Sequence, residues 1–421
     1  MSAGITRSVK IRGKTMIYIR YNEKERLNKM KVVDIRSIFS KRNIELFDVG
    51  KSYIYYAEEK NEGGHNDLFI LEYNRSTGKE RLVTNYTLED PTFVEHLYAF
   101  DNTLLLILEN GGNSMWLIEI DKTKGMELNR RKIVCTGSFR SCMALDADHL
   151  LIYMGPDEAN AGMFRQYSEV TGCECLCYLY SLRTNIKHFV KSPIIAKLGT
   201  VGIRQMEAHG EKYLVLLDPF SDEDIKRGYY EEQRWINADI RDNIWLCRLD
   251  ELERELEAGV ENITKKCVAS ADIKALARYM GTDGDKMYFR AKEFRTGIEK
   301  ICSYDISSNS LAVEAELKAP DQPGMTYIVE EKPFAVFSVT SYEKETEVKG
   351  IVNSNAALSF DNSLGSFMSC IENRYIICRA VESSADGENV LCGVSIYDSE
   401  TDKSETYRCS CYLKGNTLVL Y

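Results

Sequence analysis

Histidines are the side chains of this chain best suited to acid–base or metal chemistry near neutral pH. The sequence contains five, and they are His65, His96, His149, His188 and His209. On the strand assignment given below they fall at different ends of different repeated units. We therefore expect that they do not meet in one site and interpret each as a surface or packing residue. No catalytic residue is assigned, and we leave open whether the chain is an enzyme, with a non-enzyme favoured.

The 13 cysteines are an odd, scattered set, which favours free thiols in a reducing compartment and predicts a cytoplasmic protein. The one cluster, Cys173, Cys175 and Cys177, would place three sulfurs on one face of a strand. Zinc ligands normally occur as pairs on a turn, so we interpret this cluster as packing and predict no metal site. Glycine-rich phosphate-binding motifs are absent, and we expect no cofactor.

One long polar segment, residues 218–243, is rich in aromatic and arginine side chains. Such side chains anchor protein interfaces because they contribute large contact areas at a low cost in rotamer entropy. The predicted partner-binding residues are Phe220, Tyr229, Tyr230, Arg234 and Trp235. The alternative is that these side chains fold back and pack their own loop.

Phe-Arg pairs recur elsewhere along the chain and offer a second kind of site. Guanidinium groups that converge can bind an anion. The residues of this alternative, a small-molecule or glycan site, are Arg140, Phe164, Arg165 and Arg295.

The elements that position these candidate residues are repeated along the chain. Eight short turn dipeptides are each followed by about four apolar residues. Such strand pairs at a period of roughly 40–75 residues indicate an all-β propeller made of four-stranded blades. The turns are Gly50-Lys51, Asp101-Asn102, Ala147-Asp148, Gly210-Glu211, Gly284-Asp285, Glu331-Lys332, Glu372-Asn373 and Gly415-Asn416.

In each unit we name the strands A to D, so that the A–B and C–D turns share one end. We call this end the turn face, and the end carrying the B–C and D–A connections the loop face. In the first unit the expected strands are 45–49, 53–56, 68–73 and 81–85. The long B–C connections make the loop face the predicted functional face, and they are 58–67, 155–172, 218–243 and 381–388.

The whole chain, residues 1–421, is expected to be a single propeller domain of eight blades, with seven as the alternative. Residues 17–21 resemble a C strand, and residues 411–413 and 417–421 resemble strands A and B. Residues 1–40 are therefore expected to join residues 411–421 in one closing blade. A short helix is predicted over residues 250–258, and its glutamates are interpreted as a solvated face.

Charge and hydropathy exclude several classes of partner. The net charge of −10 disfavours nucleic acid, whose phosphates would be repelled. No run approaches 18 apolar residues, which argues against membrane insertion, and the first residues contain no apolar signal-peptide segment.

The strand–turn units resemble those of bacterial propellers of the TolB-like and PQQ-repeat-like kinds. The segment Tyr73-Asn74-Arg75-Ser76-Thr77-Gly78-Lys79 carries this resemblance, and 304–307 and 397–401 carry it more loosely. Only three tryptophans are present, so quinone binding is not implied. The leading functional hypothesis is a non-catalytic scaffold that binds a protein partner through its loops. The alternative is a small-molecule or glycan-binding propeller, or a weak hydrolase or lyase, with a site at the axial mouth.

Overall fold

The computed structural model describes residues 9–11, 14–16, 30–35, 43–50, 52–62, 65–88, 92–111, 114–218, 243–270, 275–293, 296–317, 325–331, 334–383, 389–414 and 416–421. The chain divides into two compact units, which we describe in turn. The larger unit is residues 37–323, and the smaller unit consists of residues 1–36 with 324–421.

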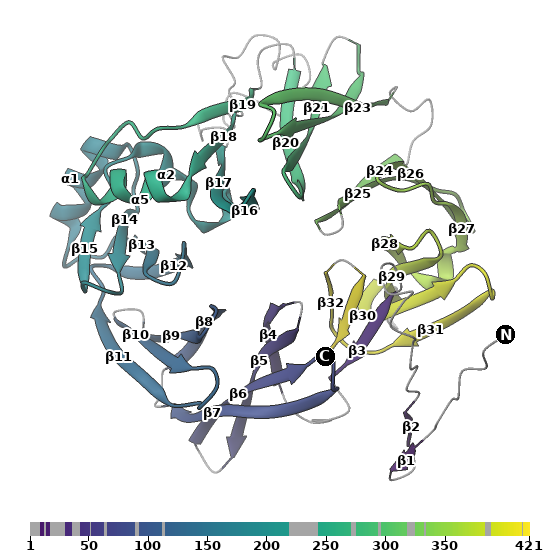
Figure 1. Cartoon of the computed structure of the whole chain (residues 1–421), viewed down its shortest axis with the longest axis horizontal. Helices are drawn as coiled ribbons and strands as arrows, with labels where there is room; N and C mark the ends of the chain where they lie inside the picture. Colours follow the sequence, from purple (N-terminus) through teal and green to yellow (C-terminus); the bar gives the residue numbers. More distant parts are fainter. Residues whose placement is uncertain are drawn as a thin grey trace. The chain divides into compact units, whose positions relative to one another are not determined.

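The larger unit contains five antiparallel sheets of four consecutive strands each (Figure 1). The first sheet is β4 (Asn43–Val49), β5 (Tyr53–Glu62), β6 (His65–Asn74) and β7 (Lys79–Leu88). The second is β8 (Thr92–Ala99), β9 (Thr103–Asn110), β10 (Ser114–Asp121) and β11 (Glu127–Val134). The third is β12 (Ser138–Ala144), β13 (His149–Gly155), β14 (Leu176–Ser181) and β15 (Ile186–Phe189).

The fourth sheet is β16 (Ile203–Ala208), β17 (Glu211–Asp218), β18 (Asn243–Arg248) and β19 (Lys266–Ser270). The fifth is β20 (Ala275–Asp283), β21 (Lys286–Glu293), β22 (Glu299–Asp305) and β23 (Ser310–Leu317). Among the described residues, helices occupy three connections: α1 (Ala161–Thr171) follows β13, α2 (Pro193–Leu198) with the 3-10 turn η2 (Thr200–Gly202) follows β15, and α5 (Leu249–Glu257) follows β18.

Apolar side chains on both faces of the central strands bind successive sheets together. Leu104, Leu106 and Ile118 of the second sheet pack in one cluster with Leu68 and Ile70 of the first. A second cluster runs from the second sheet through the third to the fourth, and a third joins the fourth to the fifth. Strands buried on both faces read as near-continuous apolar runs, and β9, with the sequence Thr-Leu-Leu-Leu-Ile-Leu-Glu-Asn, is of this type.

The C–D turns of the first, second, fifth and seventh sheets share one local device. A side-chain oxygen at the first position accepts backbone N–H groups, and the fifth position adopts a positive φ. Asn74 accepts from Ser76 and Thr77 before Gly78, whose φ is 66°. The equivalent pairs elsewhere are Asp121 with Gly125, Asp305 with Asn309, and Asp398 with Asp402.

The smaller unit contains three sheets and a short hairpin of β1 (Val9–Ile11) and β2 (Lys14–Met16). The sixth sheet is β24 (Met325–Glu331), β25 (Phe334–Ser341), β26 (Glu345–Val352) and β27 (Ala357–Asp361), followed by the turn η3 (Asn362–Leu364). The seventh is β28 (Ser366–Ile371), β29 (Tyr375–Ser383), β30 (Asn389–Asp398) and β31 (Lys403–Tyr407). The eighth is β3 (Lys31–Asp34), β33 (Thr417–Leu420) and β32 (Cys411–Lys414).

These sheets are the blades of an all-β, eight-bladed propeller, which confirms the fold expected from the repeated turns and decides for eight blades over seven. The eighth blade combines the two ends of the chain. There β3 runs parallel to β33, with Lys31 opposite Thr417. The segment 17–21, expected to supply strand C of this blade, lies outside the described residues.

Two of the expected long loops are instead regular structure. In the first sheet, residues 58–62 and 65–67 continue β5 and β6, which stay paired as far as Glu62 and His65. Residues 155–172 contain α1. Both corrections have the same cause: local turn chemistry marks where a strand begins, whereas pairing with the neighbouring strand decides how far it extends. No helix among the described residues has the length and apolarity needed to cross a bilayer.

Candidate functional site

The predicted partner-binding residues all lie in one segment that falls outside the described residues. These residues are Phe220, Tyr229, Tyr230, Arg234 and Trp235. Arg295, from the alternative set, also lies outside them. Binding of a protein through residues 218–243 therefore stays a prediction.

The three described members of the alternative ligand set do not form a common site. Phe164 is buried and its ring packs against Gly137, so it fixes α1 to the third sheet. Arg165 is exposed on α1, and Arg140 is exposed on β12 with its guanidinium against Gly155. No hydrogen bond or ion pair among the described residues joins the two arginines. The Phe164 ring fills part of the core, and a ligand-binding role for this alternative set stays a prediction.

A pocket of about 140 Å³ opens on the loop face between the first and second sheets. Its lining comes from the ends of strands that meet there: β7 ends at Leu88, β8 begins at Thr92, and β9 ends at Asn110. We call it the Trp116 pocket. Its lining residues are Tyr86, Thr87, Leu88, Thr92, Leu108, Asn110, Trp116, Ile118 and Arg130.

Two aromatic rings and one guanidinium dominate this pocket. Arg130 of β11 lies 5.5 Å from the centre of the Tyr86 ring and 5.8 Å from that of Trp116. Lys132, two residues on and on the same face of β11, also lies over Trp116, at 5.6 Å, but does not line the pocket. Such cation–π contacts hold the indole ring in one orientation.

The polar groups of the Trp116 pocket are arranged to donate hydrogen bonds. Glu127 accepts from Arg130 at Nε and Nη2, with the shortest contact 2.7 Å, and thereby neutralises and orients the guanidinium. The Tyr86 hydroxyl is enclosed; Thr84 is its polar neighbour, but no described residue gives it a hydrogen bond of normal geometry. Burial, with a smaller contribution from Glu127, raises the pKa of Tyr86, so the hydroxyl keeps its proton and can donate.

This chemistry suits the binding of a ligand by ring contacts and hydrogen bonds. The described lining residues include no carboxylate, histidine or cysteine. Pockets for drug-sized ligands measure roughly 300–1,000 Å³. At about 140 Å³ the Trp116 pocket accommodates one small ring or the end group of a longer molecule.

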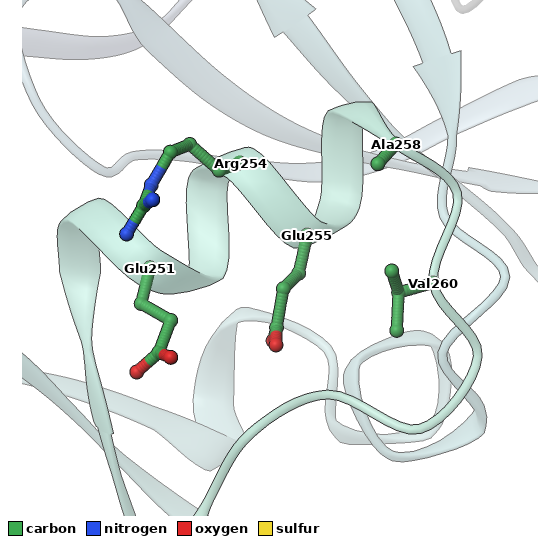
Figure 2. A pocket seen from close by; sticks show the side chains of 5 residues that line it. All are labelled: Glu251, Arg254, Glu255, Ala258 and Val260. Carbon is green, nitrogen blue, oxygen red and sulfur yellow. The ribbon is translucent and has the colours of Figure 1, made fainter.

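A second hollow, of about 220 Å³, lies on the exposed side of α5 and is less suited to a ligand (Figure 2). Its lining is Glu251, Arg254, Glu255, Ala258 and Val260. Two of its three charged groups are already engaged locally: Arg254 donates to the Asp250 carbonyl, and Glu255 accepts from Thr264. The hollow is therefore a shallow surface of the helix.

Sequence reasoning chose the loop face but missed the Trp116 pocket on it. The available signal was weak. Trp116 and Ile118 are two residues apart and so share one face of their strand, as do Arg130 and Lys132 on the next strand. A short Asn-Gly-Gly-Asn segment at 110–113 precedes the strand of Trp116. Alternation of this kind occurs in most half-buried strands, and only the packing of the neighbouring sheet turns it into a pocket.

No family model and no curated protein matches the sequence. Among solved structures the chain is similar to a prolyl endopeptidase, at 10% identity and a TM-score of 0.46, over 87% of this chain and 49% of that one. It is also similar to dipeptidyl peptidase 4 of Porphyromonas gingivalis, at 10% identity and a TM-score of 0.46, over 90% of this chain and 55% of that one. The chain thus spans about half the length of these two enzymes. An uncharacterized protein of Listeria monocytogenes EGD-e is similar at 10% identity and a TM-score of 0.43, over 90% of this chain and 97% of that one.

Proposed function

We propose that this propeller binds a small neutral polar ligand, of the class of a saccharide unit, in the Trp116 pocket. The observation that carries the proposal is the combination of two flat aromatic rings with hydrogen-bond donors around one pocket. A sugar ring offers an apolar C–H face to an aromatic ring and hydroxyls to the surrounding donors and acceptors. Tyrosine and tryptophan serve such ligands because each joins an apolar body to a polar group.

The charge balance favours a neutral ligand over an anion. Glu127 neutralises the one cation in the lining, Arg130, through a bidentate contact. A further anion would have to compete with this carboxylate. Hydroxyl groups need only the remaining donors, namely the Tyr86 hydroxyl, the Asn110 amide and the guanidinium edge that Glu127 leaves open.

The test is a binding screen of neutral methyl glycosides by saturation-transfer-difference NMR, followed by affinity measurement with wild type and variants. We expect Arg130→Gln to weaken binding about tenfold or more, as for the loss of a hydrogen bond to a charged group. Tyr86→Phe is expected to weaken binding about fivefold without destabilising the protein, because its hydroxyl has no good partner in the fold. Lys132→Gln is the matched control, since this residue also lies over Trp116 but outside the pocket.

Three results would refute the proposal. One is that no glycoside binds the wild-type protein. Another is that Arg130→Gln and Tyr86→Phe both leave the affinity unchanged. The third is a preference for glucuronate or inorganic phosphate over the neutral glycosides, which would assign a charged ligand.

A further inference from the structure

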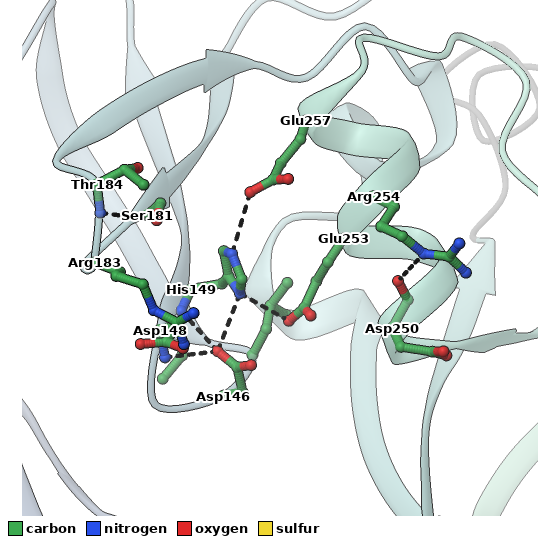
Figure 3. A network of polar contacts seen from close by, with 12 residues as sticks. Asp146, Asp148, His149, Ser181, Arg183, Thr184, Asp250, Glu253, Arg254 and Glu257 are labelled. Atoms are coloured by element: carbon green, nitrogen blue, oxygen red, sulfur yellow. Dashed lines mark hydrogen bonds and ion pairs between the residues drawn. The ribbon is translucent and has the colours of Figure 1, made fainter.

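A second polar centre lies on the turn face of the larger unit, away from the Trp116 pocket (Figure 3). We call it the His149 cluster, and it consists of Asp146, His149, Glu253 and Glu257. Asp146 lies in the turn between β12 and β13, His149 is the first residue of β13, and the two glutamates come from α5. Residues more than 100 positions apart thus converge on one imidazole.

Local structure fixes both halves of the cluster. Asp146 Oδ1 accepts the backbone N–H groups of Asp148 and His149, each at 2.7 Å, and so holds the turn that presents the imidazole. In α5, Leu252 and Leu256 are fully buried against the core and fix the rotation of the helix. Glu253 and Glu257 directly follow these two leucines and are four residues apart, so both project from the same helix face.

The distances within the cluster match those between ligands of one metal ion. His149 Nδ1 lies 3.2 Å from Asp146 Oδ1 and 3.3 Å from Glu253 Oε1, and the three atoms all lie within 4.8 Å of one another. Two ligand atoms at about 2.0–2.2 Å from a tetrahedral ion are separated by about 3.4 Å. No rearrangement of the backbone is needed to bring these atoms into a first coordination sphere.

Hydrogen bonds within the protein do not satisfy these atoms. His149 Nδ1 and Glu253 Oε1 are both enclosed, yet neither makes a hydrogen bond to a described residue in spite of the short separation. The two atoms face each other at ion-pair distance without donor–acceptor alignment. A buried polar group in this state needs a further partner, and a cation placed between the atoms would contact both.

The charge of the cluster points the same way. Three carboxylates surround one imidazole in the His149 cluster. The neighbouring arginines are directed elsewhere: Arg183 pairs with Asp148, and Arg254 donates to the Asp250 carbonyl (Figure 3). The carboxylates therefore exceed the positive charge that contacts them among the described residues.

Glu257 occupies the position of an outer partner. Its Oε1 lies 3.3 Å from His149 Nε2, the ring nitrogen on the opposite side from Asp146 and Glu253. Histidines that bind a metal through one nitrogen usually donate the other N–H to a carboxylate, which fixes the tautomer and the ring orientation. Glu257 provides that carboxylate.

We propose that Asp146, His149 and Glu253 bind one divalent transition-metal ion, with Glu257 as the positioning residue for the imidazole. A single imidazole with two carboxylates suits Zn²⁺ or the harder Mn²⁺ better than ions that are selected by thiolates. The ion clamps the turn of the third sheet to the helix that follows β18 of the fourth. Its role in this proposal is structural, because three protein ligands are contributed by two rigid elements.

The test is a titration of metal-free wild-type protein with Mn²⁺, in which EPR measures the free ion. Mn²⁺ is the probe because thiolates bind it poorly, so the 13 cysteines interfere little. We expect one bound equivalent, and Zn²⁺ should displace it and restore the signal of free Mn²⁺. Glu253→Gln and His149→Asn should each weaken binding at least tenfold.

Two further variants separate positioning from ligation. Glu257→Gln is expected to weaken Mn²⁺ binding about 10–100-fold, the usual effect of removing an outer-sphere partner. Glu251→Gln is the matched control, on the same helix but in the hollow of Figure 2, and should bind as wild type does. Absence of Mn²⁺ binding by wild type, or equal binding by folded Glu253→Gln and Glu251→Gln, would overturn the proposal and leave His149 as a packing neighbour of the carboxylates.

Discussion

Two turns at the same place in successive sheets each carry a histidine, and their surroundings differ sharply. His149 follows the A–B turn of the third sheet, is 16% exposed and faces Asp146, Glu253 and Glu257. His209 lies in the A–B turn of the fourth sheet and is 60% exposed. Its Nε2 contacts one carboxylate, Asp285, at 2.9 Å, together with the Ser307 hydroxyl. The difference teaches that a turn histidine becomes part of an enclosed site only where another element covers it.

The covering element is α5, and its removal should have the largest effect. Leu252→Ala empties a fully buried position in the helix, and we expect a loss of about 2–5 kcal/mol in the free energy of unfolding, measured with urea. Mn²⁺ binding should fall with it, because Glu253 and Glu257 lose their fixed placement. A loss below about 1 kcal/mol with Mn²⁺ binding intact would show that the turn holds the site without the helix.

The second-largest expected effect is a gain in the free energy of unfolding on addition of metal, which should depend on the His149 turn and not on the His209 turn. At a free Mn²⁺ concentration of about 100 times its dissociation constant, the free energy of unfolding should rise by about 2.7 kcal/mol. Thermal melts with and without a chelator would measure this. The gain should persist in His209→Asn and disappear in Glu253→Gln. A gain that is lost in His209→Asn and kept in Glu253→Gln would place the metal at the exposed His209 turn.

The histidines themselves should differ in the absence of metal. We expect His149→Asn to cost about 1–3 kcal/mol, because it leaves the enclosed Glu253 carboxylate oxygen without the imidazole that faces it. His209→Asn removes an exposed pair and should cost about 0–1 kcal/mol. Urea midpoints of the two variants measured side by side test this, and equal losses would mean that burial by α5 has no energetic consequence.

The smallest change in the free energy of unfolding is expected for an exposed residue beside the His149 turn. Arg183 pairs with Asp148 beside the cluster, but the arginine side chain is 76% exposed. Arg183→Gln should change the free energy of unfolding by no more than about 0.5 kcal/mol and leave Mn²⁺ affinity unchanged. A larger change in Mn²⁺ affinity would mean that the Asp148–Arg183 pair contributes to the metal site.

Much of the fold was predictable from local sequence. The turn dipeptides mark the strand starts because Gly, Asn and Asp tolerate the positive φ and side-chain bonding that tight turns need. The same logic explains Gly78 and Asn309 in their C–D turns. The lengths of β5 and β6 were not predictable, since an acidic, polar run such as Glu58–Glu62 continues as a strand only because its partner strand pairs with it.

The sites were much less predictable. The glutamates of α5 look like a solvated face in the sequence, yet Glu253 is 13% exposed and faces His149. The Phe-Arg pairs suggested a common site. Phe164 is buried in the core, and no described contact joins Arg140 to Arg165. Residue type alone does not distinguish a ligand-facing side chain from a packing one, because both are aromatic or charged.

The sequence alone determined the propeller, since turn chemistry and apolar strand runs act over a few residues and repeat along the chain. It also indicated which end of the sheets carries the long connections, although α1 and the extended β5–β6 pair reshape them. Only the tertiary structure decided that Tyr86 meets Trp116 across two sheets, and that Glu253 reaches an imidazole 104 positions earlier. These contacts depend on how neighbouring elements pack, which no local pattern of residues encodes.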